Sequence, residues 1–110
     1  MKKYFGQWQS LEDIEGNFNQ KTGLTSKDIL FSYYCYEDYS GKAIVLFVSP
    51  EDGLLYEVYG GHCSCNGLDG QWEPERTTWE ALHKIKSLGE YDDATAREAL
   101  ERLVMRNLKS

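Results

Sequence analysis

The sequence is short of positive charge and has no long apolar run. Of its 110 residues, 12 are lysine or arginine and 18 are aspartate or glutamate, for a net charge of −6. Such a chain cannot neutralise a run of phosphates, so we expect no direct binding to nucleic acid and no docking on an anionic membrane. No apolar stretch approaches the roughly 20 residues of a membrane-spanning helix. The two lysines after Met1 precede no apolar stretch, so we expect no secretory signal and a cytoplasmic protein.

Cysteine is scarce, and the sequence contains few residue patterns that are typical of catalytic sites. Cys35, Cys63 and Cys65 are an odd number, which without a secretory signal indicates reduced thiols. A cysteine nucleophile would need His83 nearby and an acid to orient that histidine, and nothing else in the sequence supports this arrangement. The Gly60-Gly61 pair is not followed by the Gly-Lys-Ser/Thr of a phosphate loop. We therefore predict a protein that is not an enzyme and has no cofactor.

Aromatic residues, by contrast, are abundant. The chain has 8 tyrosines, 4 phenylalanines and 3 tryptophans. Large rings bury much area per residue, so they suit the core of one small domain spanning residues 1–110. The alternative is that some of them form an aromatic contact surface.

Three segments predict β-strands. Residues 28–36 alternate in a pattern rich in aromatic residues, residues 42–48 form a continuous apolar run, and residues 54–59 form a third short segment. Loops of about five residues join them, which favours antiparallel pairing of neighbours. The sequence thus predicts a three-stranded antiparallel meander.

Three further segments predict helices. Ser10 is placed to cap a helix over residues 10–19. Thr77 and Glu80 have the form of a capping box for a helix to about residue 87, stopped by Gly89. A last helix, capped by Asp92 or Asp93, has a one-sided apolar stripe: Ala96, Ala99, Leu100, Leu103, Val104 and Leu108. The predicted fold class is α+β, with the meander packed against an N-terminal short helix and two C-terminal helices.

The connector over residues 60–76 holds the one cluster of soft metal ligands. Structural zinc needs four such ligands, so Cys63 and Cys65 would need distant partners such as Cys35 and His83. In an extended segment, His62 would point away from the two cysteines, and the usual two-residue gap between cysteines is absent. We expect no metal site, with zinc bound by Cys63, Cys65, Cys35 and His83 as the alternative.

The same connector contains two acids and a tryptophan before the second helix. Glu73 and Glu75 flank Pro74, and a solvated loop that leads into a helix N-terminus explains them better than acid–base catalysis. Trp72 is expected to close the connector onto the core, with stacking on a ligand as the alternative.

Acidic residues also mark the two predicted hairpin turns. Glu37 and Asp38 fall in the first turn, and Glu51 and Asp52 in the second. If both turns end on the same side, they form a negative patch that steers the protein toward a basic groove. The simpler explanation is that turns are charged because they are solvated. The candidate partner-binding residues are Glu37, Asp38, Tyr39, Glu51, Asp52, Asp69, Trp72, Glu73 and Glu75.

Residues 60–82, GGHCSCNGLDGQWEPERTTWEAL, resemble a block found in small proteins encoded by bacteriophages and prophages. Residues 4–14 resemble the aromatic opening and helix of the same group. The resemblance implies a phage or mobile-element context in a bacterial host, and no reaction.

Together, these features lead to the hypothesis of a small acidic accessory protein that binds a host protein. One concrete form is an anti-CRISPR-like inhibitor of a defence nuclease, in which the partner is an enzyme that handles nucleic acid. A zinc-binding module built on residues 62–65 is the alternative function. A homodimer is a further alternative, in which the apolar stripe of the last helix faces a second copy.

Overall fold

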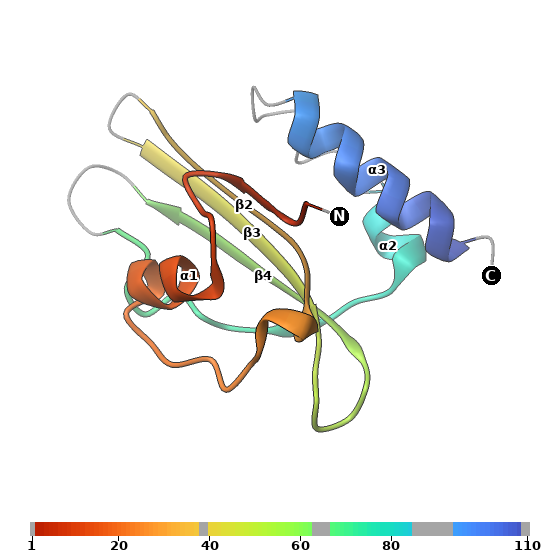
Figure 1. Ribbon diagram of the computed structural model, residues 1–110, viewed down its shortest axis with the longest axis horizontal. Coiled ribbons are helices and arrows are strands. Elements are labelled where there is room, and N and C mark those ends of the chain that lie inside the picture. Colours follow the sequence, from red (N-terminus) through yellow and green to blue (C-terminus); the bar gives the residue numbers. More distant parts are fainter. Residues whose placement is uncertain (1, 38–39, 63–66, 85–93, 109–110) are drawn as a thin grey trace.

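The computed structural model describes residues 2–37, 40–62, 67–84 and 94–108. The chain forms an α+β fold, as predicted, in which helices cover both faces of one sheet (Figure 1). Its elements are β1 (Tyr4–Gly6), α1 (Leu11–Phe18), the 3-10 turn η1 (Ser26–Asp28), β2 (Ile29–Glu37), β3 (Ser40–Val48), β4 (Leu55–His62), β5 (Glu75–Arg76), α2 (Trp79–Lys84) and α3 (Ala94–Leu108).

The sheet is larger than the predicted meander. Strands β2, β3 and β4 form that antiparallel meander, but β1 pairs in parallel with β2, and β5 pairs with the outer side of β4. The prediction of three strands was therefore wrong, and the sheet is mixed and five-stranded. Both missed strands are very short, so neither leaves a periodic pattern in the sequence.

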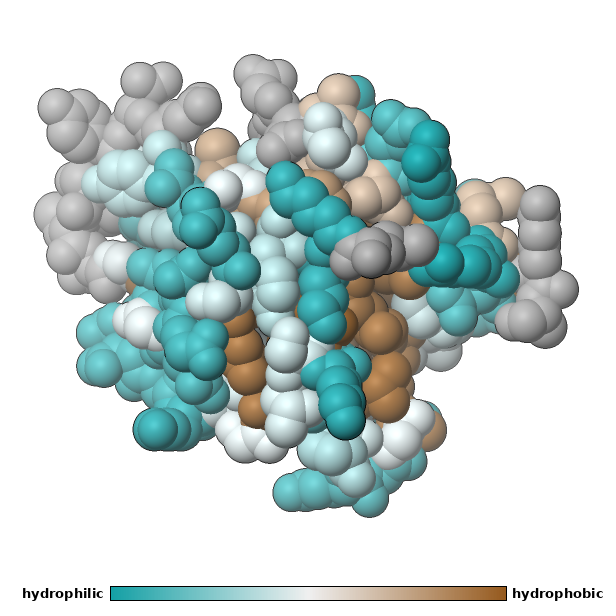
Figure 2. All heavy atoms as spheres, in the orientation of Figure 1, coloured by the Kyte–Doolittle hydropathy of each residue, from teal (hydrophilic) through white to brown (hydrophobic). Residues whose placement is uncertain are grey.

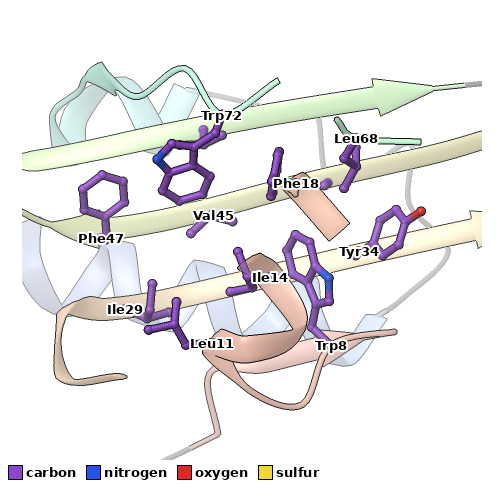
Figure 3. Close-up of a cluster of buried hydrophobic side chains, with 12 residues drawn as sticks. Trp8, Leu11, Ile14, Phe18, Ile29, Tyr34, Val45, Phe47, Leu68 and Trp72 are labelled. Atoms are coloured by element: carbon purple, nitrogen blue, oxygen red, sulfur yellow. The ribbon is translucent and has the colours of Figure 1, made fainter. Parts of the chain in front are cut away.

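Alternate residues of the meander face α1 on one side of the sheet. Ser10 caps α1 as predicted, since its Oγ accepts a hydrogen bond of 3.3 Å from the backbone N–H of Asp13. The predicted apolar face of α1 is buried against the sheet together with Trp8 (Figure 3). This first cluster contains Trp8, Leu11, Ile14, Phe18, Ile29, Tyr34, Ala43, Val45, Phe47, Val58, Leu68 and Trp72.

The opposite face of the sheet packs against α2 and α3. Four residues of the predicted stripe on α3 are buried there, and Ala99 and Leu108 pack against them. The stripe therefore faces the chain's own sheet. This second cluster contains Phe5, Phe31, Tyr33, Ile44, Leu46, Leu82, Ala96, Leu100, Leu103 and Val104.

The start of α2 corrects one prediction. Thr78, and not Thr77, precedes the first helical residue, and its Oγ1 accepts a 3.1 Å hydrogen bond from the backbone N–H of Ala81. The backbone N–H of Thr77 instead donates to the carbonyl of Leu55, at 3.0 Å, and so continues the sheet. The predicted stop at Gly89 and the caps at Asp92 and Asp93 lie outside the described residues.

Hydrophilic side chains cover most of the face seen in Figure 2, with apolar side chains between them. Among the described residues, none of the helices has the length and apolar character needed to cross a membrane.

Candidate functional site

A shallow groove opens between two loops that are distant in the sequence. Residues 22–24, which precede η1, form one wall, and residues 49–52 of the β3–β4 turn form the other. The two loops lie side by side at the lower edge of Figure 1. Phe47, Tyr56, Trp72 and Pro74 complete the lining, and the volume is about 290 Å³. This is just below the roughly 300–1,000 Å³ of small-molecule sites, and it suits one or two side chains of a partner.

Three aromatic rings form the floor of the groove. The ring of Phe47 lies between those of Tyr56 and Trp72, at centroid distances of 5.6 and 5.8 Å and interplanar angles of 12° and 14°. Phe47 and Tyr56 are directly paired across β3 and β4. Trp72 comes from the connector, and its ring lies beside that of Phe18 (Figure 3). The two ring centroids are 5.1 Å apart and the rings are inclined at 73°. Phe47 and Trp72 are buried, so two of the three rings of the floor are packed into the core.

Asp52 is the most firmly held acid of the groove. Its two carboxylate oxygens accept hydrogen bonds from the backbone N–H of Leu54, at 2.9 Å, and the hydroxyl of Tyr56, at 2.6 Å. The Tyr56 hydroxyl first, and the Leu54 amide second, hold the pKa of Asp52 below its ordinary value. The same bond raises the pKa of Tyr56. At neutral pH the carboxylate of Asp52 is therefore ionised and held in place by its hydrogen bonds, next to the exposed Glu51. Glu51 and Asp52 form an acidic rim of the groove.

The opposite wall is tied to α1 by a second carboxylate. Glu15 accepts hydrogen bonds from the backbone N–H and the hydroxyl of Thr22, at 2.8 and 2.9 Å. The bond from the Thr22 amide is the largest cause of the lowered pKa of Glu15. The hydroxyl of Thr22 also accepts from the backbone N–H of Leu24, at 3.2 Å. Residues 22–24 are thus a wall whose shape is set before any partner arrives.

One positive charge lies beside this acidic rim. Arg76 on β5 is paired directly with Tyr56 on β4. Its charge lowers the pKa of both Asp52 and Tyr56, although less than their mutual hydrogen bond changes either one. The negative charge of Asp52 is therefore partly offset by Arg76.

The groove brings together three of the predicted partner-binding residues, Glu51, Asp52 and Trp72. The exposed Glu73 follows Trp72 in the chain and precedes Pro74 of the lining. Glu75 pairs instead with Glu57 across β4 and β5. Asp69 is exposed in the turn over residues 67–70 and does not line the groove.

The two acidic turns do not end on the same side of the sheet. Glu37 ends β2 and pairs with Ser40 at the start of β3, whereas Glu51 and Asp52 follow the other end of β3 (Figure 1). Consecutive hairpins of a meander turn at opposite ends of the strand that they share. The single patch that combined the acids of both turns was therefore a wrong expectation. Asp38 and Tyr39 lie outside the described residues.

Trp72 takes its predicted place on the core. It is buried, packs between Phe47 and Phe18, and also lines the groove. Closing the connector and contacting a ligand are thus compatible roles for this side chain.

The candidate zinc ligands are described only in part. Cys63 and Cys65 lie outside the described residues. Cys35 is half-buried and packs against the cluster under α2 and α3, and His83 is exposed on α2. Among the residues that the structure describes, no three His, Cys, Asp or Glu side chains are grouped to hold an ion.

His62 is engaged on the other face of the sheet from Cys35. Its Nε2 lies 2.6 Å from the hydroxyl of Tyr34, with which it forms a hydrogen bond, and its ring lies 5.2 Å from that of Tyr36. This side chain therefore packs among tyrosines on the α1 side.

The sequence did not reveal several lining residues. Phe47 was expected only as part of a buried strand, and Tyr56 only as part of the next one. The signal that unites them is the hairpin register, because residues 49–54 close the turn through a 2.9 Å bond from the N–H of Ser49 to the carbonyl of Leu54.

Comparison of this chain with protein-family models, with curated proteins and with solved structures finds no match.

Proposed function

We propose that this protein catalyses no reaction and acts by binding another protein through the groove beside the β3–β4 turn. The partner presents a positively charged surface there. The observation that supports this proposal most directly is the packed aromatic floor bordered by Glu51 and the ionised Asp52. Aromatic residues are enriched at protein interfaces, and rings that are already fixed lose little entropy when a partner binds.

The lining of the groove favours binding over chemistry. Its members are aromatic, leucine, proline, small or acidic residues, and none is a histidine, cysteine or lysine. The hydroxyls of Thr22, Ser49 and Tyr56 line the groove without a histidine to activate them, and the lining supplies no thiol or amine nucleophile. A shallow groove also leaves a reacting group in water, which weakens electrostatic catalysis.

The resemblance to phage-encoded proteins suggests that the partner belongs to the bacterial host. Enzymes that handle nucleic acid have basic grooves, and an acidic protein is drawn to such a groove by long-range attraction. A host-defence nuclease inhibited in the anti-CRISPR manner is the concrete form that we propose.

The test is capture of a partner from the native host with tagged protein, followed by titration of the purified partner by calorimetry. The test variant is Glu51→Lys, and the matched control is Glu101→Lys, which makes the same charge change at an exposed position of α3. We expect the first variant to weaken binding at least tenfold and the second to leave it unchanged. If both variants bind as the wild type does, the groove is not the contact.

A further inference from the structure

We propose that the groove holds one arginine side chain of the partner, with its methylene stem along the apolar lining and its guanidinium paired with Glu51 and Asp52. This inference rests on the proposed function, because it specifies the partner's chemistry at the same site.

The shape of the groove fits a long side chain with an apolar stem. Leu24 and Pro50 lie on the two walls, and Phe47 and Trp72 form the floor between them. Arginine and lysine both cover apolar surface with their stems while the charged head stays in water. A short polar side chain would leave this lining in contact with water.

The rim favours arginine over lysine. Two carboxylates follow each other on one turn, and each oxygen of Asp52 already accepts one hydrogen bond, from Leu54 or from Tyr56. A planar guanidinium offers five N–H donors in a fixed fork, so it can pair with both acids at once, whereas an ammonium acts as a point charge. Asp52 needs no rearrangement to accept it, since its bonds already fix its position.

Arg76 provides an internal check on this assignment. It is the cross-strand neighbour of Tyr56, and its charge acts on both Tyr56 and Asp52. A partner's guanidinium must approach against this charge. Loss of Arg76 should therefore strengthen binding, which is an effect that a merely structural role of the groove would not produce.

The experiment is a titration of isotope-labelled protein, followed by NMR, with N-acetyl-arginine amide, N-acetyl-lysine amide and N-acetyl-citrulline amide. Citrulline keeps the shape of arginine but carries no charge. One ion-paired side chain in an exposed groove supplies little free energy, so we expect a dissociation constant on the order of 10 mM for arginine. The saturating shifts should be confined to residues that line or adjoin the groove, such as Leu24, Asp52, Leu54, Tyr56 and the indole of Trp72.

The variants give the direction of the effect. Glu51→Gln should weaken arginine binding at least threefold, Arg76→Gln should strengthen it at least twofold, and Glu101→Gln on α3 should leave it unchanged. Unaltered amide shifts away from the groove show that each variant is folded. Lysine should bind more weakly than arginine, and citrulline should cause no saturating shift.

The inference would be overturned by no saturating shift with arginine, by equal binding of citrulline, or by weaker binding of arginine to Arg76→Gln than to the wild type. Equal binding of lysine would also contradict the inference, because the planar set of N–H donors on the guanidinium would then contribute nothing to binding. Failure here is distinguishable from failure of the proposed function. If the variant Glu51→Lys no longer captures the host partner, but the wild type does not bind free arginine, the proposed binding function stands. Only the inference that the groove holds an arginine side chain is then refuted.

Discussion

The hydroxyl of Tyr56 donates a 2.6 Å hydrogen bond to a carboxylate oxygen of Asp52 at the rim of the groove. This bond is the largest cause of the lowered pKa of Asp52. A carboxyl group whose pKa is lower in the folded state stabilises the fold above its ordinary pKa of 3.8, and this contribution is lost as the pH falls through the folded-state value.

Replacing Tyr56 by phenylalanine should therefore lower the Tm at pH 7, because Asp52 loses the donor that favours its charged form. The difference from the wild type should shrink as the pH falls below about 3.8. Thermal denaturation from neutral to acidic pH measures both effects. The control is Tyr4→Phe, which removes a hydroxyl that hydrogen-bonds the Oγ of Ser26 at 2.9 Å. Serine does not titrate in this range, so the effect of the control should not depend on pH.

The contribution of Glu57 to the stability of the fold depends on pH in the opposite direction from that of Asp52. Burial is the largest cause of its raised pKa, and the neighbouring charge of Glu75 raises it further, against the effect of hydrogen bonds from Thr77 and Tyr59. The folded protein thus binds this proton more tightly than the unfolded chain. The resulting stabilisation is complete below the ordinary pKa of 4.5 and is lost as the pH rises through the folded-state value.

We expect Glu57→Gln to raise the Tm at pH 7, where the wild type holds an ionised and half-buried carboxylate. Below about pH 4.5 the gain should disappear, since both side chains are then neutral. An NMR titration of the Glu57 carboxyl checks the cause directly. In the variant Glu75→Gln its pKa should move down toward 4.5, and an unchanged pKa would show that the neighbouring charge has no influence.

The zinc alternative leads to a separate prediction. A structural zinc ion requires four ligands, and the usual two-residue gap between cysteines is absent from Cys63-Ser64-Cys65, a segment that lies outside the part of the chain that the structure describes. Protein purified without a chelator should therefore contain no stoichiometric zinc, and EDTA should not change its Tm. Elemental analysis and thermal denaturation test this. One zinc per chain, removed together with the fold, would establish the alternative function.

The sequence predicted those parts of the fold that have long periodic patterns. The meander, α1 with its Ser10 cap and the stripe of α3 all follow from sequence patterns that extend over six or more residues. Strands β1 and β5 have three residues and two. They form because neighbouring strands supply hydrogen-bond partners. The carbonyl of Tyr34 on β2, for example, accepts a 2.8 Å hydrogen bond from the backbone N–H of Gln7, which follows β1. Pairing of this kind is tertiary and leaves no local pattern.

The candidate site was less predictable, for a geometric reason. The acids of both turns were visible, but only the direction of each strand shows that Glu37 and Glu51 lie at opposite ends of β3. The meander topology alone was enough to separate them. The approach of residues 22–24 to the β3–β4 turn, by contrast, depends on the bonds between Glu15 and Thr22, which no spacing indicates.

Two glycines should respond oppositely to replacement by alanine. A Cβ on Gly41 would fall onto the imidazole of His62, its cross-strand partner, which is held by the 2.6 Å bond to Tyr34. Gly41→Ala should therefore destabilise the fold by about 1–3 kcal/mol, the usual cost of overpacking. Gly16 lies within α1, and a Cβ there would meet nothing within 4 Å. Gly16→Ala should stabilise by about 0.5–1 kcal/mol, because alanine loses less backbone entropy in a helix.

Urea denaturation of both variants measures the two changes in the free energy of unfolding. The double variant Gly41→Ala/His62→Ala separates steric cost from any other effect of the new methyl group. Removing the imidazole makes room for the Cβ, so alanine at position 41 should cost far less in the His62→Ala background than in the wild type. An equal cost in both backgrounds would mean that His62 does not enforce glycine at this position, and that the close packing of Gly41, His62 and Tyr34 is not what fixes this end of the sheet.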